Sequence, residues 1–361
     1  MASANAQVIG KRGWNRISIG ISILILAVAA FTLSRLLRET DVGRVVAEVQ
    51  AKPFRTLLIA VCFVAISYVV LTCYDLFALR TIRRNTVPYR VAVFAGFTAY
   101  TIGHNLGATV FTAGAIRLRI YSAWGFGFVE VGKIAFVTGL TFWLGNGFVL
   151  GAGMIFVPAA ASAIDHFPTW VNRVVGISIL VLIAAYLCWL IPRPRVLGPA
   201  KAQIVLPGVR LTLLQIAIGV LDLTAAATVM YTLLPAQPAI NFLSFVVIFA
   251  SALLLGFLSH APGSLGVIEA VMLIGLAQFQ KEELLASLLI FRVLYFMLPL
   301  AIAAALLGVW ELWLLVKAAH GREQPERPSD RRLSSVPIPK FVPSCGKLIY
   351  EFRNRRTLAN L

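Results

Sequence analysis

The chain has 361 residues, of which 59% are hydrophobic and 13% are charged. A soluble domain carries about 25% charged residues, so this composition excludes a soluble enzyme, a disordered protein and a receptor with a single membrane anchor. The apolar runs are long and do not alternate in polarity, as the strands of an outer-membrane barrel would. The composition therefore predicts an all-α, polytopic transmembrane helical bundle.

The net charge of +17 would indicate a nucleic-acid partner in a soluble protein. In a membrane protein it indicates basic loops held at the cytoplasmic surface by anionic lipid headgroups. We therefore expect membrane lipids as partners and no nucleic acid, and a homo-oligomer is left open. The four cysteines form no CxxC pair, and the sequence predicts neither a disulfide framework nor a metal site.

Taken in chain order, eight apolar runs predict about eight full spans. A span needs about 20 apolar residues, and the runs lie at residues 17–37, 56–79, 89–111, 133–157, 172–191, 209–232, 240–258 and 284–316. Two shorter stretches that contain glycine, 112–130 and 262–280, predict broken or re-entrant segments. Such irregular backbone is tolerated at membrane depth only where protein or water surrounds it.

The distribution of basic residues predicts the orientation. Residues 80–90 and 193–210 are rich in arginine and lysine, whereas 158–171 and 233–239 contain neither. The first two loops are therefore expected in the cytoplasm and the other two outside, which places both termini in the cytoplasm of a bacterial inner-membrane protein. Residues 35–55 disagree with this scheme because they should be external and yet carry five basic residues; an amphipathic interfacial helix would reconcile them.

The composition changes after Lys317. We expect residues 1–317 to form the membrane domain and residues 318–361, with five prolines and many arginines, to form a cytoplasmic tail without a packed core. Contact with anionic lipid is favoured for this tail over a specific partner.

The order of elements suggests an inverted repeat. The runs that contain Asp75 and Asp222 are expected to cross the membrane in opposite directions, and each precedes a further helix, a glycine-containing stretch and a long helix. The segment Gly114–Arg117 can be laid over Gly266–Glu269. Inverted repeats with broken helices are typical of transporters.

A few charged residues lie where the bilayer penalises them by about 2.5–3.5 kcal/mol on insertion scales. They are Asp75, Arg117, Arg119, Asp222, Glu269 and Arg292. The alternative to a functional role is a buried ion pair that fixes helix packing, which is favoured for Glu130 and Lys133, three residues apart on one helix face. For Asp222 function is favoured, and for Asp75 both interpretations stay open.

No catalytic motif supports an enzyme. The sequence has no G-x-S-x-G nucleophile elbow, P-loop, dinucleotide fingerprint or HExxH pattern, so we expect no catalytic residues, no cofactor and no ATP-driven transport by this chain alone.

Several segments resemble the lysylphosphatidylglycerol synthase transmembrane-region family, whose best-known member is the multiple peptide resistance factor. Arg117 and Tyr121 fit a G-G-x-x-R-x-x-x-Y-like segment. A P-G-G-x-G-x-x-E-like segment is matched by Pro262, Gly263, Gly266 and Glu269. The chain departs from these patterns in reading Ala113-Gly114 for the double glycine and in having Ser264 at the second glycine of the other segment.

The resemblance covers about residues 15–317 and implies a lipid flippase domain without the soluble aminoacyl-transferring domain. On this hypothesis Arg117, Arg119 and Arg292 bind headgroup phosphate, while Asp75, Asp222 and Glu269 bind cationic groups or protons, and Gly263 and Gly266 supply flexible backbone near an anion site. The alternatives are a membrane accessory protein or enzyme subunit of lipid, hopanoid or cell-envelope glycan synthesis, and a structural partner recruited through the tail.

Overall fold

The computed structural model describes residues 47, 50–82, 87–106, 109–191, 195–198, 203–259 and 262–320. The predicted all-α membrane bundle is confirmed, because five helices in this part of the chain are long and apolar enough to cross a membrane. The chain divides into two compact units, Met1–Leu312 and Trp313–Leu361. The predicted span at 17–37 and nearly all of the predicted tail lie outside the described residues.

The first half of the bundle consists of a long helix, a hairpin of two shorter helices and a second long helix. Helix α3 (Phe54–Thr81) is followed by α4 (Tyr89–Leu106) and α5 (Thr109–Tyr121), which pack against each other. A short 3-10 turn, η1 (Ser122–Trp124), leads into α6 (Phe128–Phe156). With 13 residues, α5 rises only about 20 Å and cannot cross a hydrocarbon core of about 30 Å.

A connecting region joins the two halves. It contains α7 (Pro158–Asp165), α8 (Thr169–Leu190) and a two-stranded antiparallel ribbon of β1 (Val196–Leu197) and β2 (Ile204–Val205). Helix α8 corresponds to the predicted span at 172–191. Neither α7 nor the ribbon is predicted from the sequence.

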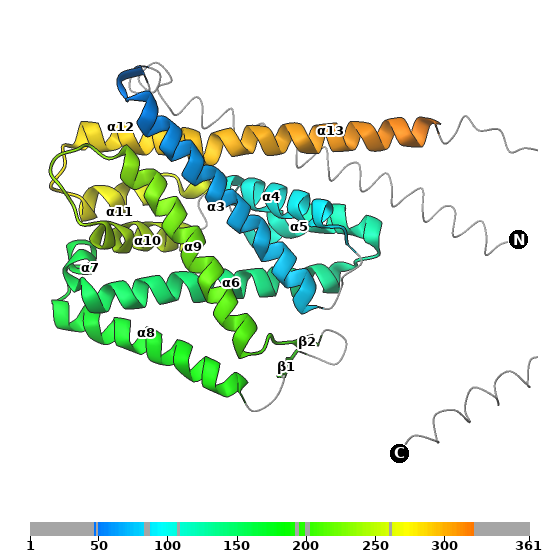
Figure 1. Cartoon of the computed structure of the whole chain (residues 1–361), viewed down its shortest axis with the longest axis horizontal. Helices are drawn as coiled ribbons and strands as arrows, with labels where there is room; N and C mark the ends of the chain where they lie inside the picture. Colours follow the sequence, from blue (N-terminus) through cyan, green and yellow to red (C-terminus); the bar gives the residue numbers. More distant parts are fainter. Residues whose placement is uncertain are drawn as a thin grey trace, which may run out of the picture. The chain divides into compact units, whose positions relative to one another are not determined.

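The second half repeats the order of the first. Helix α9 (Val209–Leu233) is followed by α10 (Phe242–Leu258), the turn η2 (Pro262–Ser264) and α11 (Val267–Gly275), and α10 and α11 pack together as a second hairpin. Helix α12 (Lys281–Phe291), the π-helical segment η3 (Arg292–Met297) and α13 (Leu298–His320) then continue as one long helix (Figure 1).

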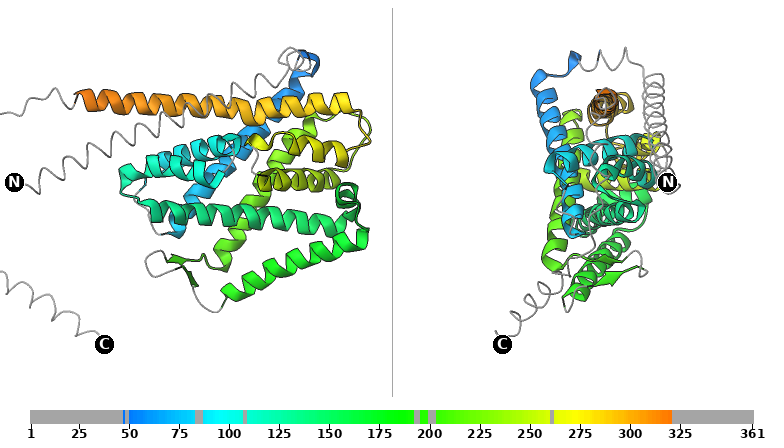
Figure 2. Two further views of the ribbon diagram at one scale, coloured as in Figure 1. Left: turned by 180° about the vertical axis from the view of Figure 1, so that it is seen from behind. Right: turned by 90° about the vertical axis from the view of Figure 1, so that its right-hand side faces the viewer.

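The halves run in opposite directions and meet along α3 and α9, which lie side by side in Figures 1 and 2. Lys52, just before α3, donates to the carbonyl of Leu233 at the last residue of α9 (3.0 Å). At the opposite ends, Thr81 of α3 and Ile204 of β2 line one cavity. The end of α3 and the ribbon before α9 therefore lie on one side of the bundle, which agrees with the prediction that the loops next to them share one face of the membrane.

Two boundaries differ from the sequence-based expectation. The run 89–111 is not one span, because α4 ends at Leu106 and α5 begins at Thr109. In addition, Gly114 lies inside α5, whereas Gly266 precedes α11 with a φ of 79°, so the overlay of Gly114–Arg117 on Gly266–Glu269 is wrong in register. Hydropathy could not locate the hairpin, because both of its arms are apolar.

Helices α6 and α9 approach closely at a pair of glycines. A Cβ atom added to Gly145 would lie 2.4 Å from the Cα of Gly219, so a side chain at this crossing would force the two backbones apart. Gln215 of α9 also donates to the hydroxyl of Thr141 in α6 (2.9 Å). This crossing fixes α9 against α6 and so determines where Asp222 lies within the bundle.

Candidate functional site

The first charged cluster joins α3 to the hairpin of α4 and α5. Asp75 is fully buried, and Arg117 is 3% exposed. The Nε of Arg117 lies 3.1 and 3.0 Å from the two carboxylate oxygens of Asp75, and its Nη2 lies 2.6 Å from Oδ1. The hydroxyl of Tyr121 donates to Oδ2 (2.9 Å), and the guanidinium stacks over the Tyr100 ring at 4.8 Å. Asp75 is therefore neutralised by a planar, two-pronged contact of the kind that arginine favours.

The second charged cluster lies at the irregular backbone between α10 and α11. Glu269 accepts from the Nε of Arg292, and the Nη1 of Arg292 donates to the carbonyl of Gly263 (3.1 Å). The other carboxylate oxygen of Glu269 accepts from the backbone N–H of Gly266 (2.8 Å). The side chains of Glu269 and Arg292 are 21% and 8% exposed, so this pair is more accessible than the first.

The tips of the two hairpins meet at this second cluster. The side-chain amide of Asn105, near the end of α4, donates to the carbonyl of Phe296 (3.4 Å). A Cβ atom added to Gly263, whose φ is 59°, would lie 3.7 Å from the carbonyl oxygen of Asn105. The side-chain oxygen of Asn105 is buried without a hydrogen-bond partner, which is an uncommon and costly condition in a protein interior. The end of α4 thus lies against the irregular backbone of the second hairpin, and the side chain of Asn105 at this end keeps one acceptor unsatisfied.

Arg119 belongs to neither cluster. Although it lies two residues after Arg117 on α5, its Nη2 pairs with Glu311 of α13 (2.9 Å). The two side chains are 16% and 12% exposed. Glu311 was not identified as a site residue in the sequence, because it lies in the apolar run before the basic tail and no motif marks it.

Asp222 is buried in a third cluster, with hydroxyl groups around it. Its Oδ1 accepts from Ser67 (2.8 Å) and its Oδ2 from Tyr74 (3.1 Å). Ser67 also shares a hydrogen bond with the hydroxyl of Tyr295 (2.8 Å). Within the described residues, Asp222 forms no ion pair with an arginine, lysine or histidine. In this part of the chain Asp222 is therefore buried without the ion pair that was the alternative to a functional role, and its hydroxyl partners were not identified as site residues in the sequence.

Aromatic rings connect the three clusters. Tyr74, which donates to Asp222, packs edge-on against Tyr100 with ring centroids 5.6 Å apart, and Tyr100 lies beneath Arg117. Tyr295 stacks on Phe291, one residue before Arg292. These rings exclude water from around the charged groups, so the electrostatic interactions there are stronger than they would be at a surface.

The predicted site residues therefore divide among three places. The structure brings together Asp75, Arg117 and Tyr121, and separately Gly263, Gly266, Glu269 and Arg292. Asp222 lies between these groups, and Arg119 lies apart. Glu130, for which a pair with Lys133 was predicted, accepts from the backbone N–H of Gly127 (3.0 Å).

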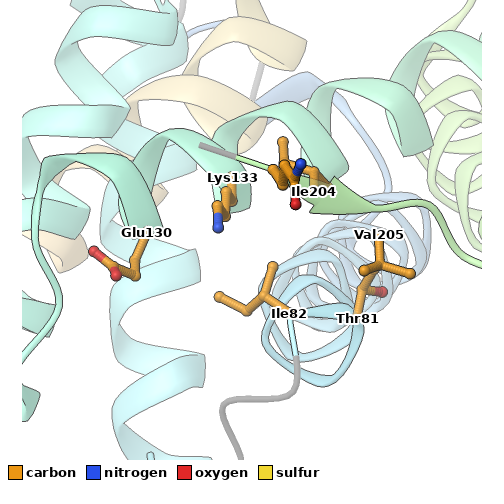
Figure 3. A pocket seen from close by; sticks show the side chains of 7 residues that line it. Thr81, Ile82, Glu130, Lys133, Ile204 and Val205 are labelled. Carbon is orange, nitrogen blue, oxygen red and sulfur yellow. The ribbon is translucent and has the colours of Figure 1, made fainter. Parts of the chain in front are cut away.

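A cavity of about 140 Å³ lies at the end of the bundle where α3 finishes. Figure 3 shows Glu130 and Lys133 of α6 beside the ribbon. The cavity lining consists of Thr81, Ile82, Glu130, Lys133, Gln203, Ile204 and Val205. None of the residues of the three charged clusters lines this cavity.

These features define the class of protein: a polytopic helical membrane protein with two opposed helical hairpins and charged side chains buried between them. No protein-family model matches the chain. The inner membrane protein YbhN of Escherichia coli is 30% identical over 252 residues, which cover 68% of this chain and 77% of that protein. The chain belongs to the YbhN family of inner membrane proteins.

The chain is also similar to two other kinds of bacterial protein. An uncharacterized protein of Synechocystis is 28% identical over 314 residues, covering 86% of this chain and 94% of that protein. A phosphatidylglycerol lysyltransferase of Staphylococcus aureus is 26% identical over 249 residues, which are 66% of this chain and only 28% of the enzyme. The resemblance stated from the motifs is thus confirmed in part, as a similarity to a segment of those enzymes. A multi-pass inner-membrane location is supported, and the orientation of the termini stays a prediction.

Proposed function

We propose that this protein moves a phospholipid or a polyprenyl-type lipid between the leaflets of the inner membrane. The observation that carries the proposal is that each helical hairpin holds an arginine–carboxylate pair inside the apolar bundle, Arg117 with Asp75 and Arg292 with Glu269. A lipid that crosses the bilayer needs polar groups along its path, because its headgroup cannot face hydrocarbon without a large cost.

The two arginines suit a phosphate headgroup. A guanidinium presents its donors in a planar fork that fits phosphate and carboxylate equally well. In the described structure each fork is occupied by a protein acceptor, so an incoming phosphate would replace a carboxylate rather than enter an empty site. Such an exchange keeps the arginine paired throughout. The displaced carboxylate then takes a cationic part of the headgroup or a proton, because an isolated buried charge is costly.

The opposed halves suit alternating access. Two halves that repeat one order of elements in opposite directions can open in turn to either side of the membrane. The two hairpin tips meet at Asn105 and Gly263, so a movement of one half against the other would first change the surroundings of Arg292 and Glu269.

The relatives favour an anionic phospholipid as the first substrate to test. Similarity to part of a phosphatidylglycerol lysyltransferase supports a lipid in the phosphatidylglycerol class. It supports no aminoacyl transfer by this chain, because the similarity covers only 28% of that enzyme.

The test is lipid movement in proteoliposomes that contain the full-length protein and fluorescent phosphatidylglycerol, with a membrane-impermeant quencher outside. We expect Arg292→Gln to slow movement about 10- to 150-fold, since a hydrogen bond to a charged group contributes about 1.5–3 kcal/mol. Arg292→Lys keeps the charge and should recover part of the rate.

The matched control is Arg195→Gln. Arg195 stacks on the Trp189 ring at 5.0 Å and lies in the connecting region, away from the hairpins, so its replacement should leave the rate unchanged. If the wild-type protein moved phosphatidylglycerol, phosphatidylethanolamine and a polyprenyl phosphate no faster than empty liposomes do, the proposal would be wrong.

A further inference from the structure

Asp222 differs from the other two buried carboxylates in having no cationic partner within the described residues. Asp75 and Glu269 are each neutralised by an arginine, whereas Asp222 is held by two hydroxyl groups and is 8% exposed. A buried carboxylate is costly when it is charged and unpaired. Some mobile cation must therefore supply the neutralisation that the fold does not.

The packing favours the proton as that cation. Both carboxylate oxygens already accept a hydrogen bond from a hydroxyl group at 2.8–3.1 Å. A sodium ion or a lipid ammonium group would have to displace Ser67 or Tyr74, because interiors are packed with few voids. A proton adds no volume, and serine and tyrosine hydroxyls can accept from a carboxylic acid as readily as they donate to a carboxylate.

In the part of the chain that the structure describes, the groups that face Asp222 are hydroxyl groups of one serine and four tyrosines: Ser67, Tyr68 and Tyr74 of α3, Tyr100 of α4 and Tyr295 of η3. Four other helices also pack against α9, namely α6, α8, α10 and α12. Helix α10 has no titratable residue, and the charged residues of the others lie in their first two turns: Glu130, Lys133, Arg173, Lys281, Glu282 and Glu283. Near the end of α8 lie Tyr186 and Cys188. No fixed charge on these helices substitutes for a proton.

We infer that Asp222 is a proton-binding site, and that its protonation reverses the hydrogen bonds from Asp222 through Ser67 to Tyr295 and so couples proton movement to lipid translocation. Only this last coupling step rests on the proposed function. The charged Asp222 accepts from Ser67, whose single hydroxyl hydrogen is thereby used, so Tyr295 donates to Ser67. When a proton from water binds Oδ1, the acid donates to Ser67, and Ser67 donates to Tyr295.

The reversal reaches the second charged cluster through the π-helical segment. Tyr295 lies three residues after Arg292 in η3, and the Tyr295 carbonyl accepts from Tyr68 (2.9 Å). In a π-helix the backbone hydrogen-bonding pattern is shifted, and such segments occur frequently at functional sites. A Tyr295 hydroxyl that has lost its acceptor favours a different position of η3. Because Arg292 lies in the same segment, this movement would change the position of Arg292 relative to Glu269.

The proton site can be tested without any transport. Infrared difference spectra of the full-length protein in detergent, between about pH 5 and about pH 9, should contain the C=O band of a protonated carboxylic acid that is absent in Asp222→Asn. The matched control Asp165→Asn removes a carboxylate at the last residue of α7, which accepts from the backbone N–H of Phe167, and should keep the band. In Tyr74→Phe the band should move to higher frequency, because the carboxyl group has lost a hydrogen bond.

Four outcomes decide between the possibilities. If the wild-type spectrum contains no band that Asp222→Asn removes, the inference is overturned. A band whose titration changes when choline is replaced with sodium overturns it as well. In proteoliposomes with an imposed pH gradient, loss of the gradient's effect on lipid movement in Asp222→Asn supports the coupling. If the band is present and the wild-type protein moves no lipid, the proposed function fails while the proton site stands.

Discussion

The two arginine–carboxylate pairs have the same chemistry in different surroundings. Asp75 and Arg117 lie between regular helices and are 0% and 3% exposed, whereas Glu269 and Arg292 lie beside irregular backbone and are 21% and 8% exposed. The first pair is completed by the side chain of Tyr121, and the second by backbone groups of Gly263 and Gly266.

The two pairs are therefore suited to different roles, one structural and one in contact with lipid. Side-chain partners on regular helices can change only if whole helices move, which suits the first pair to holding α5 against α3. Backbone partners at a glycine turn can reorient locally, and greater exposure gives a headgroup access. The second pair is therefore where we expect a lipid phosphate to compete first.

The largest effect should follow from breaking the enclosed pair. Asp75→Asn leaves Arg117 buried without its countercharge, and breaking a buried pair in this way costs about 3–5 kcal/mol. Chemical unfolding of the detergent-solubilised protein should show this loss of stability. The double variant Asp75→Asn with Arg117→Gln should recover much of it, because no unpaired charge remains. Equal stabilities for the single and double variants would show that charge is not what holds this pair.

A smaller loss is expected at the accessible pair. Glu269→Gln should lower the free energy of unfolding by about 1–2 kcal/mol, between the values for surface and fully buried pairs, since Arg292 retains the carbonyls of Gly263 and Ser264 as acceptors. The rate of lipid movement should nevertheless fall by more than this loss of folding stability alone would cause. A stability loss as large as that of Asp75→Asn would remove the distinction between the two pairs.

The two glycines that the sequence overlay equates should differ, and one of them should give the smallest effect. Gly266 has a φ of 79°, a region that costs a side chain about 1–2 kcal/mol, so Gly266→Ala should destabilise the protein by about that amount. Gly114 is helical, and a Cβ there would meet nothing within 4 Å. Gly114→Ala should change stability by about 0.5 kcal/mol or less. Equal losses in the two variants would contradict the structural difference between the hairpins.

The sequence predicted the membrane class, most of the long helices and the residues that carry charge into the bilayer. Apolar runs determine spans because a helix is the main structure that satisfies its own backbone in lipid. The runs at 56–79, 133–157, 172–191 and 209–232 accordingly agree closely with α3, α6, α8 and α9. The prediction of one span at 89–111 was wrong, because a hairpin of apolar helices and a single span have the same hydropathy.

The partners of the charged residues were decided only by the tertiary structure. By itself the sequence determined that Asp75, Arg117, Asp222, Glu269 and Arg292 carry charge at positions where lipid would penalise it. The partner of each carboxylate depends on helix crossings that bring distant residues together. Arg117 is 42 positions from Asp75, and Ser67 is 155 positions from Asp222. Such contacts leave no periodic or local signal in the chain, and the crossing of α3 and α9 makes Asp222 the carboxylate that is left with hydroxyl groups alone.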